Sequence, residues 1–310
     1  MAGADSFVAP CGRRHPPGGT ALCPHAYVRY EGQMRIEARG MTFDVHEGGP
    51  VDGAPVLLLH GFPQDHREWE LITPRLHAAG LRTYALDQRG YSAGARPTAV
   101  AYYRLAEPVA DAIAVLDALG IGAAHVVGHD WGAQVAWLLA ARHPERVSTL
   151  TAISVPHPRA LAEALRRHLS QRLRFAYMAF FRSGVAERVL LAGNGAVLRS
   201  MMKPIGSRAA GYAAAMREPG RLTATLNWYR ALTAGQLAGT EAVAVPTTYV
   251  WSDGDPVVGR TAAEATEAWV SGEYRLVTLR GIGHWVPEEA PQALAEVVLA
   301  RIGAYPDTGV

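Results

Sequence analysis

The sequence Val126-Val127-Gly128-His129-Asp130-Trp131-Gly132 decides the fold of this chain. An apolar, β-branched run ends in the pattern G-x-D-x-G, and an apolar pattern with helical spacing starts directly after it. A strand, a tight turn and a helix in this order are typical of a nucleophile elbow, with aspartate here in place of the usual serine. We therefore predict that Asp130 lies at the tip of a sharp turn, at the carboxyl end of a strand.

Two glycines frame this turn, and each has a physical reason to be glycine. Strand and helix backbones approach closely around Gly128 and Gly132, so a Cβ would clash there. The N-terminus of the following helix stabilises negative charge at position 130. An alternative interpretation is that Asp130 only caps this helix through its side chain, as aspartate often does.

The composition indicates a globular protein without a polyanionic partner. The 310 residues are 49% hydrophobic with a net charge of +2, so we expect no nucleic-acid partner. No apolar run reaches the roughly 18 residues of a membrane span, and no signal-peptide pattern opens the chain. We therefore expect a cytoplasmic protein with no membrane partner. Cys11 and Cys23 are the two cysteines, which excludes thiol catalysis and cysteine-based zinc sites from the main body of the chain.

Strand and helix patterns alternate through most of the chain. We predict strands over residues 34–39, 41–46, 55–60, 83–86, 124–128, 148–154, 247–251 and 274–279. We predict helices over residues 69–79, 102–119, 261–270 and 291–302, and directly after Asp130. Such alternation is typical of a mostly parallel, doubly wound α/β sheet, in which the functional site lies at the carboxyl ends of the strands.

Residues 161–237 interrupt this alternation, because they carry helical patterns and no strand signal. We predict an N-terminal extension over residues 1–30, which lack a hydrophobic period. Residues 31–155 and 240–310 should form the core, and residues 156–239 a helical cap inserted between its two halves. The expected fold class is therefore α/β, a mostly parallel doubly wound sheet with an inserted helical cap.

Three polar residues follow strand ends in the order Asp130, Asp255, His284. This is the order of nucleophile, acid and base in the catalytic triads of α/β hydrolases. Asp253 is a close rival of Asp255 for the acid. Since carboxyl ends of parallel strands share one edge of a sheet, we expect the three side chains to meet there.

A loop with a glycine, His60-Gly61-Phe62-Pro63, follows the buried strand over residues 55–60. Such a loop can aim backbone N–H groups at a developing oxyanion, although an ordinary connection from strand to helix can have the same composition. We predict that the N–H groups of Phe62 and Trp131 stabilise an oxyanion.

An aspartate nucleophile changes the reaction that is expected. A carboxylate is already ionised at neutral pH and attacks saturated carbons that bear a leaving group. Attack on an ordinary ester would give an unproductive anhydride, so the substrate should be an epoxide or an alkyl halide. The attack leaves an alkyl ester on Asp130, which is hydrolysed by water that His284 and Asp255 activate.

Two tyrosines of the expected cap distinguish these electrophiles. An epoxide opens to an alkoxide, and a phenol with a pKa of about 10 is suited to donate to it. A halide leaves as an anion and needs N–H donors, such as an indole. Tyr177 and Tyr229 therefore favour an epoxide, unless both are core aromatics with one polar end.

The chain resembles the epoxide hydrolases of the α/β-hydrolase fold over residues 34–302. The matching motifs are His60-Gly61-Phe62-Pro63, Asp87-Gln88-Arg89-Gly90-Tyr91-Ser92, Gly128-His129-Asp130-Trp131-Gly132, Asn227-Trp228-Tyr229-Arg230 and Gly283-His284-Trp285. The first and third are shared with haloalkane dehalogenases, whereas N-W-Y-R is more specific. The resemblance implies that Tyr229 and Tyr177 open the ring, the latter because it precedes Phe180-Phe181 and the turn over residues 184–187.

The sequence thus predicts an epoxide hydrolase that forms a vicinal diol from a small hydrophobic epoxide, without metal or organic cofactor. The expected catalytic residues are Asp130, Asp255, His284, Tyr177 and Tyr229. The expected oxyanion and substrate-binding residues are His60, Gly61, Phe62, Pro63 and Trp131. A haloalkane or haloacid dehalogenase and a non-catalytic ligand-binding protein on this scaffold are the alternatives, and a homodimer is left open.

Overall fold

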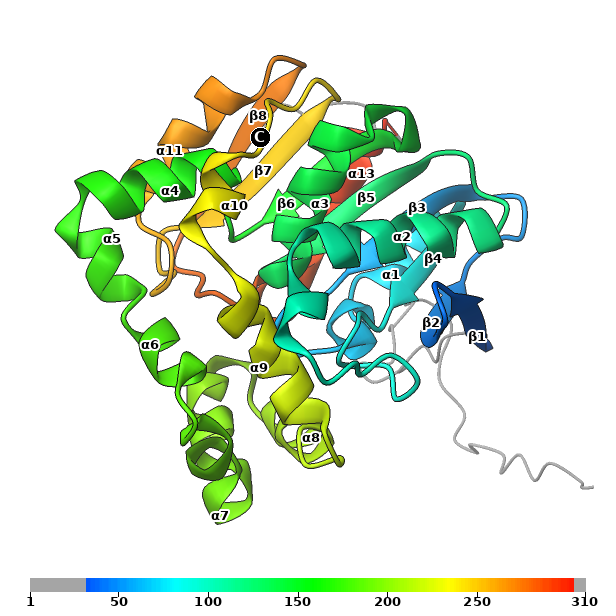
Figure 1. Ribbon diagram of the computed structural model, residues 1–310. Helices are drawn as coiled ribbons and strands as arrows, with labels where there is room; N and C mark the ends of the chain where they lie inside the picture. Colours follow the sequence, from blue (N-terminus) through cyan, green and yellow to red (C-terminus); the bar gives the residue numbers. More distant parts are fainter. Residues whose placement is uncertain (1–31, 304–310) are drawn as a thin grey trace, which may run out of the picture.

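A mostly parallel sheet of eight strands lies at the centre of the computed structural model, which describes residues 32–303 (Figure 1). Its strands are β1 (Gly32–Ala38), β2 (Met41–Gly48), β3 (Ala54–Leu59), β4 (Leu81–Leu86), β5 (Ala124–His129), β6 (Val147–Ile153), β7 (Thr247–Ser252) and β8 (Tyr274–Leu279). Their order in the sheet is β1-β2-β4-β3-β5-β6-β7-β8. The β1–β2 hairpin is antiparallel, β2 is antiparallel to β4, and the remaining pairs are parallel. The predicted sheet is therefore confirmed.

Helices cover both faces of this sheet. They are α1 (Thr73–Ala78), α2 (Ala106–Ala118), α3 (Trp131–Arg142), α11 (Arg260–Glu264), α12 (Val286–Glu289) and α13 (Pro291–Ile302). In Figure 1, α2 and α3 lie in front of the strands and α13 lies behind them. The result is a three-layer α/β arrangement, with parallel strands shielded from water on both sides.

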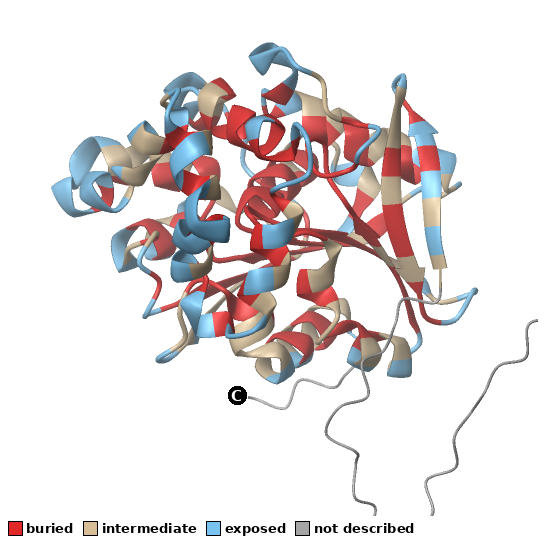
Figure 2. Cartoon of the chain, turned by 90° about the horizontal axis from the view of Figure 1, so that it is seen from below, coloured by how far each residue is buried: buried red, intermediate tan, exposed pale blue. Residues whose placement is uncertain are grey.

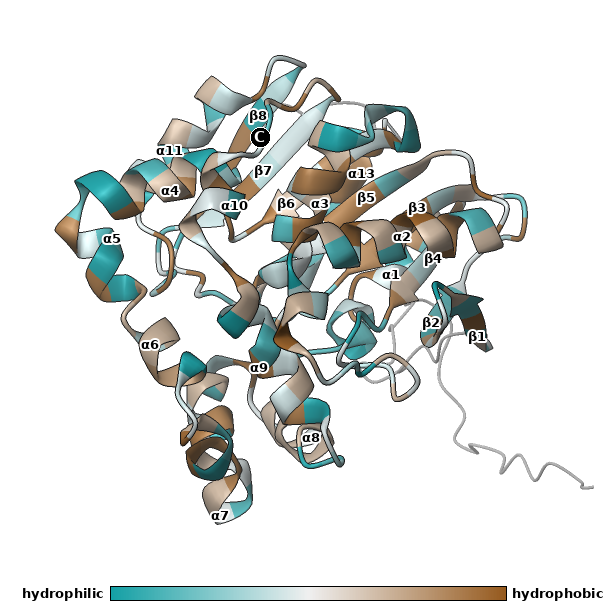
Figure 3. Ribbon diagram, viewed as in Figure 1, coloured by the Kyte–Doolittle hydropathy of each residue, from teal (hydrophilic) through white to brown (hydrophobic). Residues whose placement is uncertain are grey.

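The central strands are apolar throughout because both of their faces are buried. Leu57 and Leu59 of β3 pack in the same core as α2 and α3, whereas Val56 and Leu58 point the other way and pack with α1 and α13. Figure 2 draws the inner strands almost entirely in the colour of buried residues. Figure 3 shows the matching hydrophobic colour on α3 and α13 and hydrophilic residues on outlying α5.

An inserted set of helices connects β6 to β7. These are α4 (Pro158–Arg167), α5 (Leu169–Arg174), α6 (Tyr177–Arg182), α7 (Ala186–Met201), α8 (Arg208–Ala215), α9 (Arg221–Ala231) and α10 (Ala234–Ala238). The helical cap of the predicted fold class is thus present, and its limits at residues 156 and 239 stay a prediction. The predicted extension over residues 1–30, with Cys11 and Cys23, lies outside the described residues.

Two predicted helices begin later than the sequence pattern indicates. The helix expected from Trp69 is a 3-10 turn over His66–Trp69 followed by α1, which has Pro74 in its first turn. The helix expected from Tyr102 is a 3-10 turn over Val100–Tyr103 followed by α2, with Pro108 near its start. Proline lacks an N–H group and fits the first turn of a helix, so each helix begins one or two residues before its proline.

Within residues 32–303, no helix is both long enough and apolar enough to span a membrane.

Candidate active site

Asp130 occupies the turn between β5 and α3 in a conformation that is rare for a residue with a side chain, with φ 50° and ψ −117°. Its side chain makes no capping hydrogen bond to α3, so the interpretation of Asp130 as a simple helix cap is wrong. Instead, Oδ1 accepts a hydrogen bond of 2.9 Å from the backbone N–H of Phe62. The carboxylate is therefore turned away from its own helix and towards the loop after β3.

Three glycines make this turn sterically possible. A Cβ on Gly128 would lie 2.3 Å from the carbonyl oxygen of Gly132, and one on Gly132 would lie 1.9 Å from that of Leu59. A Cβ on Gly61 would lie 2.4 Å from Cβ of Asp130. These distances are far below van der Waals contact, so β3, β5 and α3 meet here only because the three positions lack side chains.

His284 connects two carboxylates from different strand ends. Its Nδ1 lies 2.9 Å from Oδ2 of Asp255, and its Nε2 lies 3.4 Å from Oδ2 of Asp130. Asp255 is in turn held by the backbone N–H groups of Val257 and Val258, at 2.6 and 3.2 Å from its Oδ1. Asp253 is exposed and accepts a hydrogen bond from a backbone N–H group in the loop after β8. Of the two rival acids, Asp255 is the one placed against His284.

The charges of Asp130, His284 and Asp255 stabilise one another, and we call these three residues the ion triad. Burial alone would lower the pKa of His284, but Asp255 and Asp130 outweigh it and raise that pKa from 6.5 to about 10. Burial likewise disfavours the charged form of Asp130, yet the hydrogen bond and charge of His284 lower the pKa of this carboxyl. At neutral pH the free site therefore holds an imidazolium between two carboxylates.

A second layer of polar residues fixes the backbone of His284. Its carbonyl oxygen lies 2.9 Å from Nε2 of His129 and accepts a hydrogen bond of 3.0 Å from the hydroxyl of Ser154. Nδ1 of His129 lies 3.2 Å from Glu68, and burial lowers the pKa of His129 to about 4 and raises that of Glu68. Sequence reasoning missed these supporting roles, although His129 directly precedes the predicted nucleophile.

The two predicted tyrosines, on α6 and α9, line the same cavities as Asp130. Their ring centroids lie 6.3 Å apart, and the ring of Tyr229 meets that of Trp131 edge to face at 5.0 Å. Burial raises the pKa of Tyr177 and of Tyr229, so both phenols stay protonated and able to donate. The structure therefore brings together the five predicted catalytic residues, and their roles are taken up below as a proposal.

Two cavities meet at this group. A small one of about 30 Å³ is lined by Asp130, Trp131, Gln134, Val155, Leu161, Phe175, Tyr177, Met178, Tyr229, Leu232 and Val257. A larger one of about 210 Å³ is lined by Phe62, Asp130, Tyr177, Phe181, Met201, Tyr229, Pro256, Val257, His284 and Trp285. Because Asp130 and both tyrosines border each cavity, a bound molecule can extend to either side of the carboxylate.

The residues of the predicted oxyanion loop lie in two different environments. Phe62 supplies the N–H group at Asp130 and borders the larger cavity, and it is joined to Pro63 by a cis peptide bond. His60 is fully buried, and its Nε2 accepts a hydrogen bond of 3.2 Å from the backbone N–H of Gln88. We therefore assign His60 to support of the loop, while a second N–H donor from Trp131 stays a prediction.

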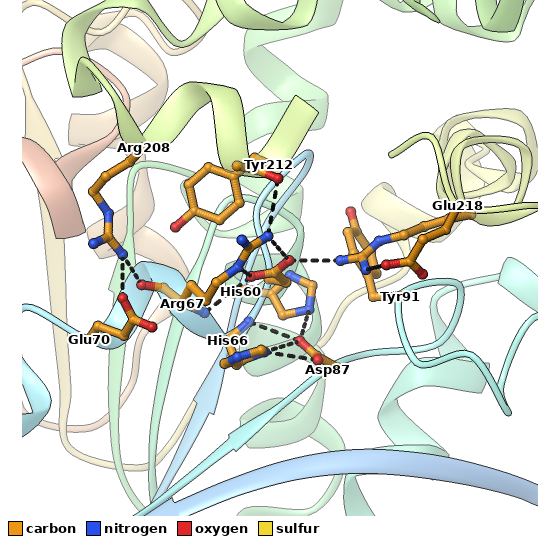
Figure 4. A network of polar contacts seen from close by, with 12 residues as sticks. His60, His66, Arg67, Glu70, Asp87, Tyr91, Arg208, Tyr212 and Glu218 are labelled. Atoms are coloured by element: carbon orange, nitrogen blue, oxygen red, sulfur yellow. Dashed lines mark hydrogen bonds and ion pairs between the residues drawn. The ribbon is translucent and has the colours of Figure 1, made fainter. Parts of the chain in front are cut away.

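Behind this loop lies a network of charged side chains around Asp87 (Figure 4). Its carboxylate lies 2.9 Å from Nδ1 of His66, 3.5 Å from Nε2 of His46 and 3.8 Å from Nε2 of His60. Burial disfavours the charged form of His66, but Asp87 raises its pKa. The contacts of Asp87 thus join the loop after β3 to the end of β4.

The same network contains a group with metal-ligand chemistry, formed by His46, His66 and Asp87. The rings of His46 and His66 stack with centroids 3.3 Å apart and 12° between their planes. A metal ion binds imidazole nitrogen in the plane of the ring, and two parallel stacked rings do not direct their nitrogens at one point. The stacked rings therefore disfavour a metal ion shared by these three residues.

Known proteins share this architecture. The family model for the alpha/beta hydrolase fold matches residues 54–291. The AB hydrolase superfamily protein YfhM of Bacillus subtilis is 32% identical over 275 residues, covering 85% of this chain and 95% of that protein. Epoxide hydrolase A of Mycobacterium tuberculosis is 32% identical over 308 residues, with the same coverage of 85% and 95%.

A solved epoxide hydrolase structure has the same fold. The crystal structure of epoxide hydrolase A from Mycobacterium thermoresistibile superposes with a TM-score of 0.76 at 29% sequence identity, and the match covers 88% of this chain and 98% of that one. Sequence, structure and the arrangement around Asp130 agree. The chain therefore belongs to the α/β-hydrolase fold family and, within it, to the epoxide hydrolases.

Proposed function

We propose that this protein hydrolyses epoxides to vicinal diols through a covalent ester on Asp130. One observation carries the proposal: the Asp130 carboxylate accepts a hydrogen bond from the Phe62 N–H group, lies against His284 and borders the same cavity as Tyr177 and Tyr229. A nucleophile, a base and two acidic O–H donors around one apolar cavity are the parts that ring opening and ester hydrolysis require.

In the first step, Asp130 attacks a ring carbon through Oδ2. Oδ1 is held by Phe62, which leaves Oδ2 as the oxygen that faces His284 and the cavity. A new carbon–oxygen bond forms, the epoxide carbon–oxygen bond breaks, and its electron pair passes to the ring oxygen. Tyr177 and Tyr229 donate hydrogen bonds to this oxygen, and one of them transfers its proton, which gives a hydroxyalkyl ester.

In the second step, water attacks the carbonyl carbon of this ester. His284 takes a proton from the water, oriented by its hydrogen bond of 2.9 Å to Asp255. The oxygen held by Phe62 becomes the oxyanion of the tetrahedral intermediate, which the Phe62 N–H group stabilises. The intermediate then expels the alcohol oxygen, which takes the proton from His284, and the diol leaves. The carboxylic acid formed at Asp130 gives its own proton to His284, so that the carboxylate is restored.

The raised pKa of His284 explains where the proton for ring opening comes from. The free site holds imidazolium because two carboxylates face it. Ring opening consumes one proton, which passes from His284 to the tyrosinate. Conversion of Asp130 to an uncharged ester removes one of the two carboxylates, so the pKa of His284 falls and the ring can act as a base. Hydrolysis of the ester then returns the proton to His284.

Single-turnover mass spectrometry of the His284→Gln variant tests this function. We expect styrene oxide to leave an adduct of intact epoxide mass on the peptide that contains Asp130, because the second step lacks its base. The matched control is His284→Gln with Asp130→Asn, which should give no adduct. An alkyl adduct from a 1-haloalkane but none from styrene oxide would identify a dehalogenase instead, and no adduct from either in folded protein would refute covalent catalysis.

A further inference from the structure

The two cavities at the site differ in size but share the residues at which the epoxide reacts. The small one has a volume of about 30 Å³ and the larger one of about 210 Å³. Asp130, Tyr177 and Tyr229 border both of them, together with Val257. The proposed mechanism places a ring carbon at Asp130 and the ring oxygen at the tyrosines. A substituent on the reacting ring can therefore enter either cavity.

Apolar side chains form most of the wall of the small cavity, and those that come from the core side are buried. Leu161 on α4, Val155 after β6 and Trp131 on α3 are all buried. Leu232, which follows α9, and Met178 on α6 line the cavity from the cap. Because buried side chains are close-packed against their neighbours, this wall limits the size of the group that fits.

The two volumes indicate how long a substituent each cavity can hold. A single water needs about 10–15 Å³ measured this way, so the small cavity has room for a group of about two heavy atoms. The larger cavity has several times that space and has Phe181, Met201 and Trp285 in its wall, which suits an extended apolar chain. His284 also borders the larger cavity, so the water of the second step can approach the ester from this side.

We propose that the small cavity receives the shorter substituent of the epoxide and accepts at most two carbon atoms. The substrate class is then the apolar epoxides with one long arm, which lies in the larger cavity, and one arm no longer than ethyl. Leu161 and Leu232 set this limit, because both line the small cavity and neither lines the larger one. This inference rests on the proposed function and specifies which epoxides the site takes.

Three isomeric epoxides test the size limit, namely trans-2,3-, trans-3,4- and trans-4,5-epoxyoctane. They have the same composition and the same trans-dialkyl ring, so they differ mainly in the shorter arm, which is methyl, ethyl or propyl. For the wild-type protein, kcat/KM should be similar for the methyl and ethyl isomers. It should be about 10- to 200-fold lower for the propyl isomer, which is the usual effect of one methylene group too many in an apolar pocket. Diol formation from each isomer is followed by gas chromatography.

Two variants attribute the limit to the small cavity. Leu161→Ala enlarges this cavity alone, so kcat/KM for the propyl isomer should rise about 10-fold or more relative to the methyl isomer. Leu232→Ala should have the same effect at a half-buried position, where removal of the side chain is less destabilising. Met201→Ala is the matched control, because it enlarges the larger cavity and should leave the propyl isomer disfavoured.

The outcomes separate this inference from the function on which it rests. Equal kcat/KM for the three isomers in the wild type would overturn the size limit and leave epoxide hydrolysis intact. A low value for the propyl isomer that persists in both leucine variants, or that Met201→Ala relieves equally, would also overturn it, since the limit would then lie outside the small cavity. Absence of diol and of covalent adduct with all three isomers in folded protein would refute the proposed function and the size limit together.

Discussion

Asp130 shows how a strained residue is held in place by its neighbours. Its backbone N–H donates to the carbonyl oxygen of Ile153 at 3.3 Å, and its own carbonyl accepts from Ala133 and Gln134 at 3.1 and 3.2 Å. Its carboxylate is fixed by Phe62 at 2.9 Å. Positive φ in a residue with a side chain is unfavourable by about 1–3 kcal/mol and persists where surrounding contacts determine it. The strain is what directs the carboxylate out of the helix and into the cavities.

Replacement of Gly61 tests this fixation directly. In Gly61→Ala the new Cβ would lie 2.4 Å from Cβ of Asp130 and 2.6 Å from its Oδ1, so the carboxylate must shift away from Phe62. A displacement of about 1 Å at a reacting group can reduce turnover about 100-fold, and we expect a loss in kcat of that order. Steady-state kinetics measures it. Gly122→Ala is the control, because a Cβ there meets no atom within 4 Å, and equal kcat in both variants would contradict the argument.

The two tyrosines should act on ring opening and not on ester hydrolysis. In Tyr177→Phe or Tyr229→Phe, one O–H donor to the developing alkoxide is lost, and we expect the rate of ester formation to fall about 10- to 1000-fold. The double variant should form no detectable ester. Rapid-quench single-turnover experiments separate the two steps.

Tyr102→Phe is the matched control for these variants, since Tyr102 is exposed on the surface and should leave both rates unchanged. If a single tyrosine variant slowed only ester hydrolysis, its assignment as a donor to the epoxide oxygen would be wrong.

At the scale of elements, the loop after β4 joins the core to the cap. Arg89 of this loop is almost fully buried and forms a paired contact with Asp111 of α2, at 2.5 and 2.7 Å. Its backbone carbonyl accepts a hydrogen bond of 3.1 Å from the indole of Trp228 on α9. The helix that carries Tyr229 is thus joined to the loop after β4 by a hydrogen bond, and the buried ion pair holds this loop against α2.

Loss of this ion pair should be strongly destabilising. Asp111→Ala removes the carboxylate that pairs with the buried guanidinium of Arg89. We therefore expect the free energy of unfolding to fall by about 3–5 kcal/mol. Denaturant unfolding measures the change. Asp117→Ala on the same helix removes an exposed carboxylate that pairs with Arg146 at 2.8 Å, and it should change stability by less than about 1 kcal/mol. Similar losses in the two variants would refute the role assigned to burial.

Elements with a strong local pattern could be predicted from the sequence. The final helix, Pro291–Ile302, has the predicted bounds, because a proline begins it and a left-handed glycine ends it. The elbow at Asp130 could also be predicted, since only glycines allow the close approach of strand and helix backbones there. The 3-10 turn before α1 could not, because it depends on hydrogen bonds such as the one from the His66 N–H group to Asp87.

At the scale of the whole molecule, the meeting of Asp130, Asp255 and His284 follows from topology. Each ends a parallel strand or follows one, so the sequence order of strands and loops predicts that they meet at one edge of the sheet. The sequence alone could not predict which buried polar atoms lack a hydrogen-bond partner. It also could not predict which residues far apart in the chain are in contact. The unbonded Oε1 of Gln134 and the contact of His129 with Glu68 arise only when separate segments pack together.

The ion triad also makes the stability of the whole protein depend on pH. The pKa of His284 is raised from 6.5 to about 10 in the folded state, so the folded protein binds a proton that the unfolded chain has lost. The resulting stability is complete below pH 6.5 and decreases as the pH rises towards 10, by at most about 1.4 kcal/mol per pH unit. The lowered pKa of Asp130 has an effect at acid pH, where stability is lost as the pH falls below 3.8.

Guanidinium unfolding of the wild type and of His284→Gln between pH 5 and pH 10 tests this linkage. The wild type should be the more stable protein at pH 6, and the difference in unfolding free energy should shrink steadily above pH 6.5, because glutamine has no proton to lose. His143→Gln, on the surface after α3, should follow the wild type throughout. A difference that stays constant from pH 6.5 to pH 10 would show that His284 is neutral in the folded protein. The proton that opens the epoxide would then have to come from another group.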